Sequence, residues 1–137
     1  MATSTGDSLS RREFGKAVAV AGVGLALPSP GVFAAGSDTV RVAVVGCGER
    51  GTSDAVYCLK SAPGVELVAI ADLFQDKVDA VGSKFQIDKA RRYSGLSGYK
   101  RLLEGKLDAV VIETPPYFHP RQSLDAVEAG KHVYVAK

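Results

Sequence analysis

The chain has 137 residues, enough for one small domain, and its 46% hydrophobic and 23% charged residues are typical of a globular protein. The formal net charge is +2. Setting aside the first 34 residues removes Arg11, Arg12, Lys16, Asp7 and Glu13, which leaves 14 basic and 13 acidic side chains. This balance excludes the basic excess that a nucleic-acid-binding face needs, and it provides no polybasic membrane patch.

The chain has two cysteines, Cys47 and Cys58. Zinc sites usually take their cysteine ligands from closely spaced pairs, and Cys47 and Cys58 do not form such a pair. We therefore expect no metal site and two free thiols, one in a tight turn and one on a helix behind it. Free thiols suit a protein that folds in the cytoplasm.

The first 34 residues have the order of a signal peptide. A charged segment, Ser-Arg-Arg-Glu-Phe-Gly-Lys, occupies residues 10–16, and a mildly apolar stretch follows over residues 17–27. That stretch is too short to cross the roughly 30 Å hydrocarbon core of a membrane as a helix. Val32, Phe33 and Ala34 place small residues at the −3 and −1 positions of a cleavage site.

The paired arginines resemble the twin-arginine motif, which marks export of already folded proteins. We therefore expect residues 1–34 to be a twin-arginine signal peptide, the export machinery to be a partner, and the mature protein to be periplasmic. An ordinary secretory peptide with a chance arginine pair, or an uncleaved anchor, remains an alternative.

Residues 35–137 alternate between predicted strands and helices. Apolar runs rich in β-branched residues predict strands at 40–45, 65–71, 107–113 and 132–136, with a weak strand near 91–94. Nearly continuous apolar runs are typical of strands buried on both faces of a parallel sheet. The sequence therefore predicts an α/β fold with a doubly wound parallel sheet, incomplete at its C-terminal end.

Helical spacing of apolar residues fills the intervals between these strands. One stripe contains Tyr99, Leu102 and Leu103, and another contains Leu124 and Val127. Further stripes lie at residues 55–62 and 78–85. Glycines at positions 64, 105 and 130 stand where these helices should end.

A glycine fingerprint, G-x-G-x-x-G, follows the first predicted strand and opens a predicted helix. It consists of Gly46, Cys47, Gly48, Glu49, Arg50 and Gly51. The first glycine permits the tight turn, the second lets a pyrophosphate approach the backbone, and the third lets the helix pack close to the strand. The phosphates would then meet free N–H groups and the positive end of the helix dipole. This context predicts a Rossmann dinucleotide-binding fold.

An acidic residue ends the second predicted strand. Asp72 stands 21 positions after Gly51, where a carboxylate can accept hydrogen bonds from the adenosine ribose hydroxyls. It would repel a 2′-phosphate, and Leu73 and Phe74 offer no arginine to hold one. We therefore favour NAD over NADP as the cofactor. The alternative is a turn aspartate that caps the next helix.

Two further motifs occur in order after the fingerprint. Thr-Pro-Pro-Tyr-Phe-His occupies residues 114–119, and Ala-Gly-Lys-His-Val-Tyr-Val-Ala-Lys occupies residues 129–137. Together with the glycines and Asp72, they resemble the N-terminal domain of the Gfo/Idh/MocA family, named for glucose–fructose oxidoreductase and inositol dehydrogenase. The resemblance covers residues 39–137.

The resemblance implies roles for individual residues. Thr114, Pro115 and His119 fall on a family loop that lines the nicotinamide side of the pocket, although His119 can also be a helix-start histidine without a ligand. The family's Glu-Lys-Pro motif falls on Ala136 and Lys137, so its glutamate is replaced here. Its lysine assists proton transfer near the reacting carbon, which makes Lys137 the candidate catalytic residue.

The resemblance also implies an activity. The first hypothesis is an NAD-dependent oxidoreductase that moves hydride between the cofactor and a sugar, polyol or related hydroxyl or carbonyl compound. A family relative that uses NAD transiently to hydrolyse a glycoside, and a non-catalytic dinucleotide-binding module, are the alternatives. Because family enzymes carry a second, substrate-binding domain, we expect this chain to be a fragment of a longer, homo-oligomeric protein.

Overall fold

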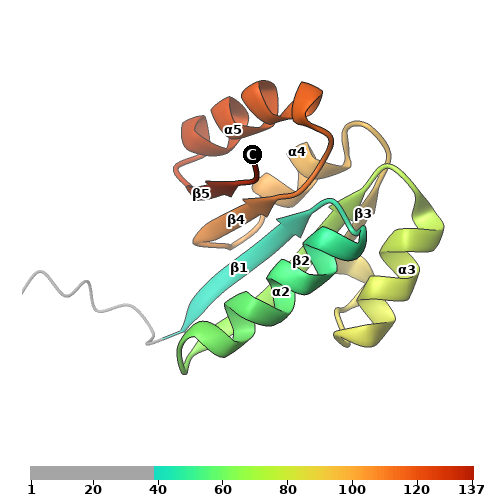
Figure 1. The fold of residues 1–137 in the computed structure, drawn as a ribbon, viewed down its shortest axis with the longest axis vertical. Helices are drawn as coiled ribbons and strands as arrows, with labels where there is room; N and C mark the ends of the chain where they lie inside the picture. Colours follow the sequence, from blue (N-terminus) through green and yellow to red (C-terminus); the bar gives the residue numbers. More distant parts are fainter. Residues whose placement is uncertain (1–38) are drawn as a thin grey trace, which may run out of the picture. The chain divides into compact units, whose positions relative to one another are not determined.

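The computed structural model describes residues 39–137, which form a five-stranded sheet in the order β3-β2-β1-β4-β5 (Figure 1). All neighbouring strands are parallel. The strands are β1 (Val40–Val45), β2 (Val65–Asp72), β3 (Arg92–Ser94), β4 (Ala109–Ile112) and β5 (His132–Val135). The predicted α/β class and parallel sheet are confirmed, including the weak strand near residue 92. β4 and β5 are shorter than the apolar runs that predicted them.

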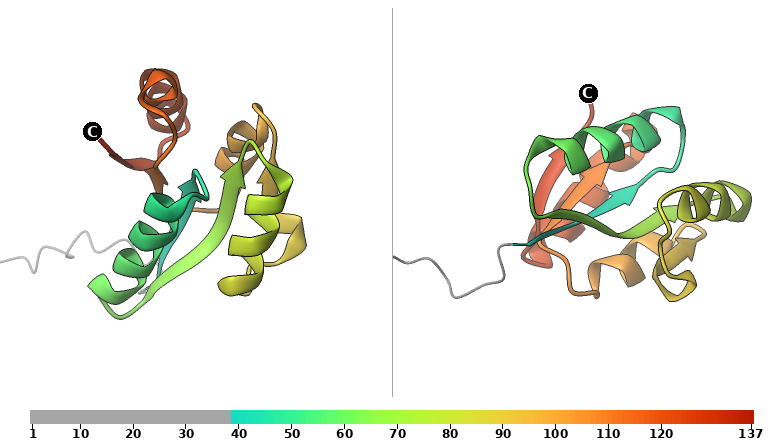
Figure 2. Two further views of the ribbon diagram at one scale, coloured as in Figure 1. Left: turned by 45° about the vertical axis from the view of Figure 1, so that its right-hand side comes forward. Right: turned by 90° about the horizontal axis from the view of Figure 1, so that it is seen from below.

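Helices cover both faces of the sheet (Figure 2). One layer contains α2 (Glu49–Ser61) and α3 (Gln75–Lys84), and the opposite layer contains α4 (Gly98–Leu103) and α5 (His119–Glu128). Two short 3₁₀ helices, η1 (Lys89–Arg91) and η2 (Pro116–Phe118), precede β3 and α5. The sheet is therefore doubly wound.

Alternation along the strands divides the core between the two layers. Val44 and Val111 pack with the α2 and α3 side, whereas Ala43 and Ile112 pack with the α4 and α5 side. Successive side chains of a strand point to opposite faces, so a strand covered by helices on both faces is apolar at every position. This burial explains the continuous apolar runs in the sequence.

The stripe predicted on α5 is wrong. Leu124 and Val127 are 49% and 61% exposed, and the buried residues of α5 are Gln122 and Ala126. These two lie four residues apart, so they form one face of the helix. Gln122 can face inward because its side-chain oxygen accepts a hydrogen bond from the Thr114 hydroxyl at 2.6 Å.

The end of α5 follows the predicted glycine cap. Gly130 has a φ of +72°, and its N–H donates to the Val127 carbonyl, while the N–H of Lys131 donates to the Ala126 carbonyl. These two bonds make a Schellman motif. Gly64 plays a different part, since α2 already ends at Ser61 and the Gly64 carbonyl instead accepts from the N–H of Val40.

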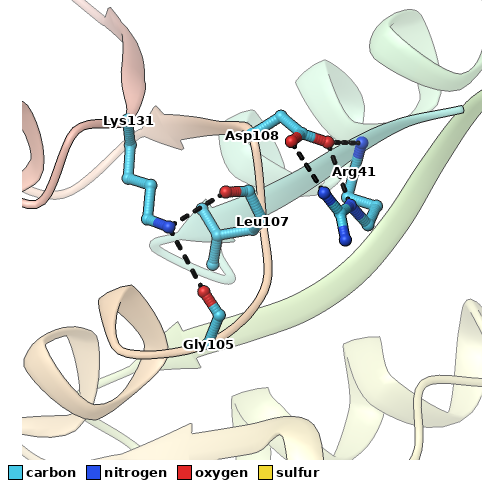
Figure 3. A network of polar contacts seen from close by, with 5 residues as sticks. All are labelled: Arg41, Gly105, Leu107, Asp108 and Lys131. Carbon is cyan, nitrogen blue, oxygen red and sulfur yellow. Dashed lines mark hydrogen bonds and ion pairs between the residues drawn. The ribbon is translucent and has the colours of Figure 1, made fainter. Parts of the chain in front are cut away.

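A polar network joins the amino ends of β1 and β4 (Figure 3). The Arg41 guanidinium donates to both carboxylate oxygens of Asp108, at 3.0 and 2.9 Å, and the Arg41 backbone N–H donates to the same carboxylate at 2.8 Å. Lys131 donates to the carbonyls of Gly105 and Leu107 beside it. Arg41 holds the pKa of Asp108 at about 2 through these hydrogen bonds. This network lies at the edge of the sheet opposite to the glycine turn.

In residues 39–137, no helix is long and apolar enough to cross a membrane, and no three histidine, cysteine, aspartate or glutamate side chains cluster to hold a metal ion. Cys47 and Cys58 are both free thiols, as predicted. The signal peptide predicted at residues 1–34 lies outside the described residues.

Candidate functional site

The glycine turn joins β1 to α2 at the carboxyl edge of the sheet. Gly46 has a φ of +105°, and a Cβ there would lie 2.6 Å from the backbone oxygen of Glu113. A Cβ on Gly51 would collide with the Gly46 carbonyl oxygen. Gly48 is the N-cap of α2, and a Cβ there would have nothing within 4 Å. Gly46 and Gly51 are therefore required by the fold, whereas Gly48 leaves open space in front of the helix.

Asp72 ends β2 directly beside this turn. One carboxylate oxygen accepts from the Cys47 N–H at 2.7 Å, and the other accepts from the Phe74 N–H at 2.9 Å. Asp72 thus makes a turn ahead of α3, although Phe74 rather than Asp72 is the N-cap of that helix. A carboxylate has about four acceptor positions, so its oxygens can still accept bonds from a ligand's hydroxyl groups.

Cys47 is a structural residue of the turn. Its thiol is buried and donates to the Ala71 carbonyl at 3.6 Å. Burial and the nearby Asp72 charge raise the pKa of Cys47 to about 12. The thiol is therefore protonated at neutral pH and unreactive.

The Thr-Pro loop after β4 is held by side chains of its own segment. The Thr114 hydroxyl donates to Gln122, and the His119 Nε2 lies 2.5 Å from the Thr114 carbonyl oxygen. Because a carbonyl only accepts, Nε2 carries a proton in this contact. His119 is the first residue of α5, so it occupies the helix-start position that the sequence left open, with its ring turned to its own loop.

A cleft of about 460 Å³ opens between the glycine turn, the end of β2 and the Thr-Pro loop. Its volume lies in the usual range for small-molecule sites. Five of the predicted site residues line it: Gly46, Gly48, Asp72, Thr114 and Pro115. The structure therefore brings residues from three separate motifs to one cavity.

The other predicted site residues do not line this cleft. Glu49 and Arg50 are exposed on the first turn of α2, and Lys137 is exposed after β5. Cys47, Gly51 and His119 lie behind the walls of the cleft, where they shape the turn and the loop. The structure thus separates residues that face the cavity from residues that support it.

Sequence reasoning missed the basic side chains of the cleft. Lys77, Lys100 and Arg121 line it from the starts of α3, α4 and α5. Each lies in the first turns of a helix that begins at the carboxyl edge of the sheet. These basic residues could have been predicted from the strand order together with the face of each helix that they occupy. Their spacing from the glycines in the sequence could not have indicated them.

Glu113 was also missed, and it is the most unusual side chain near the turn. It follows β4, its side chain is only 2% exposed, and its Oε1 has no hydrogen-bond partner. Its Oε2 lies 4.0 Å from the Arg50 Nε, which also contacts Asp54 at 3.3 Å. Burial, followed by hydrogen bonding and charge from Asp54, raises the pKa of Glu113.

The cleft fits a dinucleotide. Gly48 leaves the N-terminus of α2 accessible, and an anion there meets free N–H groups and the helix dipole. Asp72 lies at the side of the cleft where a ribose would sit, and the basic side chains offset phosphate charge.

Residues 40–137 match the family model described as "Oxidoreductase family, NAD-binding Rossmann fold", which is the Gfo/Idh/MocA family. The chain belongs to this family. The predicted resemblance to this family is confirmed.

Curated Gfo/Idh/MocA relatives include glycosidases. A "Glycosyl hydrolase family 109 protein" from Solibacter usitatus is 31% identical over 146 residues, covering 94% of this chain and 33% of the relative. An "Alpha-N-acetylgalactosaminidase" from Shewanella oneidensis is 35% identical over 111 residues, covering 77% of this chain and 24% of the relative. The chain therefore spans a third or less of the length of these relatives.

Solved structures similar to this Gfo/Idh/MocA chain include dehydrogenases and a reductase. The WlbA dehydrogenase from Bordetella pertussis, in complex with NADH and UDP-GlcNAcA, has a TM-score of 0.61 and 30% identity, over 71% of this chain and 29% of that one. A 3-ketoreductase from Actinomadura kijaniata, in complex with NADP, has a TM-score of 0.58 and 31% identity over the same shares. Scyllo-inositol dehydrogenase from Lactobacillus casei shares the fold, with a TM-score of 0.62 and 24% identity over 72% of this chain and 28% of that one.

Ala136 replaces the glutamate of the motif that the sequence resembles, and Glu113 lies beside it in the register of the two strands. Val135 pairs with Ile112, and the Ala136 N–H donates to the Ile112 carbonyl at 3.1 Å, so Ala136 stands beside Glu113 in the register. Register neighbours in a parallel sheet point to the same face. Beside Ala136, an acidic side chain therefore follows β4 where the resembling motif has one at the end of β5.

Proposed function

We propose that the chain binds a nicotinamide dinucleotide across its cleft and is the cofactor-binding part of an oxidoreductase that acts on a sugar, polyol or related compound. The observation that carries this proposal is the open N-terminus of α2. A Cβ on Gly48 would have no neighbour within 4 Å, at a turn that Gly46 and Gly51 hold rigidly. Such a helix end binds phosphate through its free N–H groups.

Different residues of the cleft would bind different parts of the dinucleotide. The first turn of α2 would hold the pyrophosphate, Asp72 would accept from the adenosine ribose, and the loop of Thr114 and Pro115 would lie against the nicotinamide side. The bound dinucleotide supplies the hydride transfer, and the protein supplies its position. Lys137 would move a proton at the substrate hydroxyl in the longer protein.

NAD is the cofactor we propose, with NADP as the alternative. Asp72 places a negative charge where a 2′-phosphate would sit. Lys77, however, lines the same cleft from the first turn of α3 and offers a cation near that position. Asp72 is closer to the glycine turn than Lys77 is, because its carboxylate accepts a hydrogen bond from the Cys47 N–H. This placement favours a ribose without a 2′-phosphate.

A second candidate is an NAD-dependent glycosidase. The curated relatives at 31% and 35% identity carry glycosidase names, which favours it. In such an enzyme, hydride removed from the sugar is returned to it, so no reduced cofactor accumulates. The cleft residues serve both reactions equally, because both begin with a bound dinucleotide.

A binding titration followed by a turnover assay tests these proposals. We expect NADH fluorescence to change on adding the chain, with saturation at one dinucleotide per chain. The longer protein, supplied with NAD and a panel of sugars and polyols, should then accumulate NADH if it is an oxidoreductase. Release of a glycoside's leaving group without NADH accumulation would instead identify a glycosidase, and binding without any turnover would identify a non-catalytic module.

We also propose export by the twin-arginine route. The match to the Solibacter usitatus relative covers 94% of this chain, so it extends into the first 34 residues. Replacing both arginines, as Arg11→Lys with Arg12→Lys, should leave the longer protein in the cytoplasm of an expressing cell. Unchanged periplasmic recovery of this variant would contradict the proposal. In the longer protein, a substrate domain and a homo-oligomeric state belong to the same proposal.

A further inference from the structure

The buried acid Glu113 needs a physical explanation. A carboxylate with 2% side-chain exposure loses its hydration, and an ionised carboxylate in that position is costly unless it is paired and hydrogen-bonded. Its Oε1 has no donor, and its nearest cation, Arg50, is 4.0 Å from Oε2. This buried and poorly paired environment favours the neutral, protonated form of the Glu113 side chain.

Asp54 is the acid that acts on Glu113 through hydrogen bonding and charge. Asp54 lies one turn into α2 with a side chain that is 12% exposed, and it already pairs with Arg50 at 3.3 Å. A protonated Glu113 can donate to the Asp54 carboxylate, so one proton satisfies both acids. The pKa of Glu113 is raised, which agrees with this arrangement, although Arg50 and His119 act against the shift.

The charge of this cluster bears directly on the phosphate site. With Glu113 neutral, Asp54 and Arg50 balance one another, and the positive end of the α2 dipole still faces an incoming anion. With Glu113 ionised, the same cluster carries one net negative charge beneath the glycine turn. The Cβ of Glu113 lies 3.4 Å from the Cβ position of Gly51, so this charge would stand against the first turn of the helix.

We propose that Glu113 is a positioning residue of the dinucleotide site, which holds Asp54 and Arg50 beneath the glycine turn as a neutral acid and so keeps the phosphate-binding end of α2 free of net negative charge. This inference rests on the proposed dinucleotide binding and deepens it. It assigns a role to a residue that belongs to none of the predicted motifs.

The groups that face Glu113 come from three elements. Asp54 and Arg50 lie on α2, and His119 faces it from the start of α5. Tyr134 of β5 interacts with Arg50 from the far side. His119 is a second ionisable group beside Glu113, so a test must separate its contribution from that of Glu113.

The experiment measures NADH affinity by fluorescence between pH 6 and pH 9 for the full chain, for Glu113→Gln, and for the exposed control Glu128→Gln. NADH affinity of the unmodified chain and of the control should fall as pH rises, by about five- to tenfold once Glu113 is fully ionised, because an added charge several ångströms from the phosphates costs about 1 kcal/mol. Glu113→Gln, which mimics the neutral acid, should keep the higher NADH affinity across the range. A variant that keeps the full pH dependence would overturn the proposal and assign the effect to His119.

A second measurement needs no cofactor. An acid whose pKa is raised in the folded state makes the protein lose stability as pH rises from its unfolded pKa, near 4.3, through its folded pKa. Urea unfolding at pH 5 and pH 8 should therefore show Glu113→Gln gaining stability relative to the unmodified chain at the higher pH. Equal differences at both pH values would overturn the neutral-acid role. Absence of NADH binding by the unmodified chain, with this stability effect present, would instead reject only the dinucleotide site.

Discussion

Gly48 and Gly51 lie three residues apart in one turn, but their side-chain hydrogens face different surroundings. A methyl group at position 48 projects into open space, whereas one at position 51 meets the Gly46 carbonyl oxygen. Gly51→Ala should therefore destabilise the fold by about 2 kcal/mol, as overpacking does. Gly48→Ala should cost only about 0.5 kcal/mol as a change of N-cap residue.

Gly48→Ala should weaken dinucleotide binding although it barely changes stability. The methyl group of Gly48→Ala occupies the space through which a phosphate approaches the backbone, so NADH affinity should fall about tenfold or more, equivalent to about 1.4 kcal/mol. Urea unfolding and NADH titration of the same two variants check both statements. Gly48→Ala binding with unchanged affinity would show that phosphate does not enter at this turn.

Asp72 controls the choice between the two cofactors. Asp72→Asn removes its charge but keeps an oxygen that can accept one of the N–H bonds from Cys47 or Phe74. We expect NADH to lose about fivefold in affinity and NADPH to gain, because a 2′-phosphate is no longer repelled and Lys77 lines the same cleft. Isothermal titrations with both cofactors measure the ratio. Adding Lys77→Ala to this variant should abolish the NADPH gain, and a gain that survives would exclude Lys77 as the phosphate contact.

The ends of the strands are held by different interactions at the two edges of the sheet. At the amino edge, the bidentate pair of Arg41 and Asp108 joins β1 to β4 far from the cleft. Both side chains are more than a third exposed, at 38% and 37%, so solvent screening leaves the pair only a small contribution to stability. Arg41→Ala should therefore lower the free energy of unfolding slightly at pH 7.

The pH dependence of this pair has a defined sign. The pKa of Asp108 is lowered to about 2 in the folded chain, so its stabilisation is present above the unfolded value near 3.9 and is lost as pH falls toward 2. The difference between the unmodified chain and Arg41→Ala should therefore shrink across this window. Arg41→Lys, which keeps the charge without the planar fork, should recover part of the loss. A difference that stays constant down to pH 2 would exclude the ion pair as its cause.

The elements were predictable where one physical signal governed them. β-branched runs predicted β1 and β2, and the glycine fingerprint predicted the turn between β1 and α2, because only glycine fits at Gly46 and Gly51. The inward face of α5 was not predictable from apolar spacing. Gln122 is buried there by a hydrogen bond to Thr114, a contact that depends on how the loop folds.

The site was predictable in its motifs and not in its surroundings. Gly46, Gly48, Asp72, Thr114 and Pro115 do meet in one cleft. Lys100 and Arg121 join them because α4 and α5 both begin at that edge, which requires the strand order to be known. Glu113 could not be recognised because its meaning depends on burial against Asp54, which belongs to another element.

Across the domain, the candidate binding cleft and the network of Arg41 and Asp108 lie at opposite edges of the sheet. The cleft lies at the carboxyl ends of the strands, where open α/β sheets bind ligands, and the network of Arg41, Asp108 and Lys131 lies at the amino ends. Substitutions at the amino edge should therefore change stability without changing cofactor affinity. The chain spans a third or less of the length of its curated relatives.

A dinucleotide that lies across the carboxyl edge of the sheet should be located by amide NMR during an NADH titration. We expect the largest chemical-shift changes at Gly46, Gly48, Asp72 and Thr114, with small changes at Arg41 and Asp108. Saturable shifts centred on Arg41 and Asp108, or no saturable shifts at all, would show that the dinucleotide does not bind there.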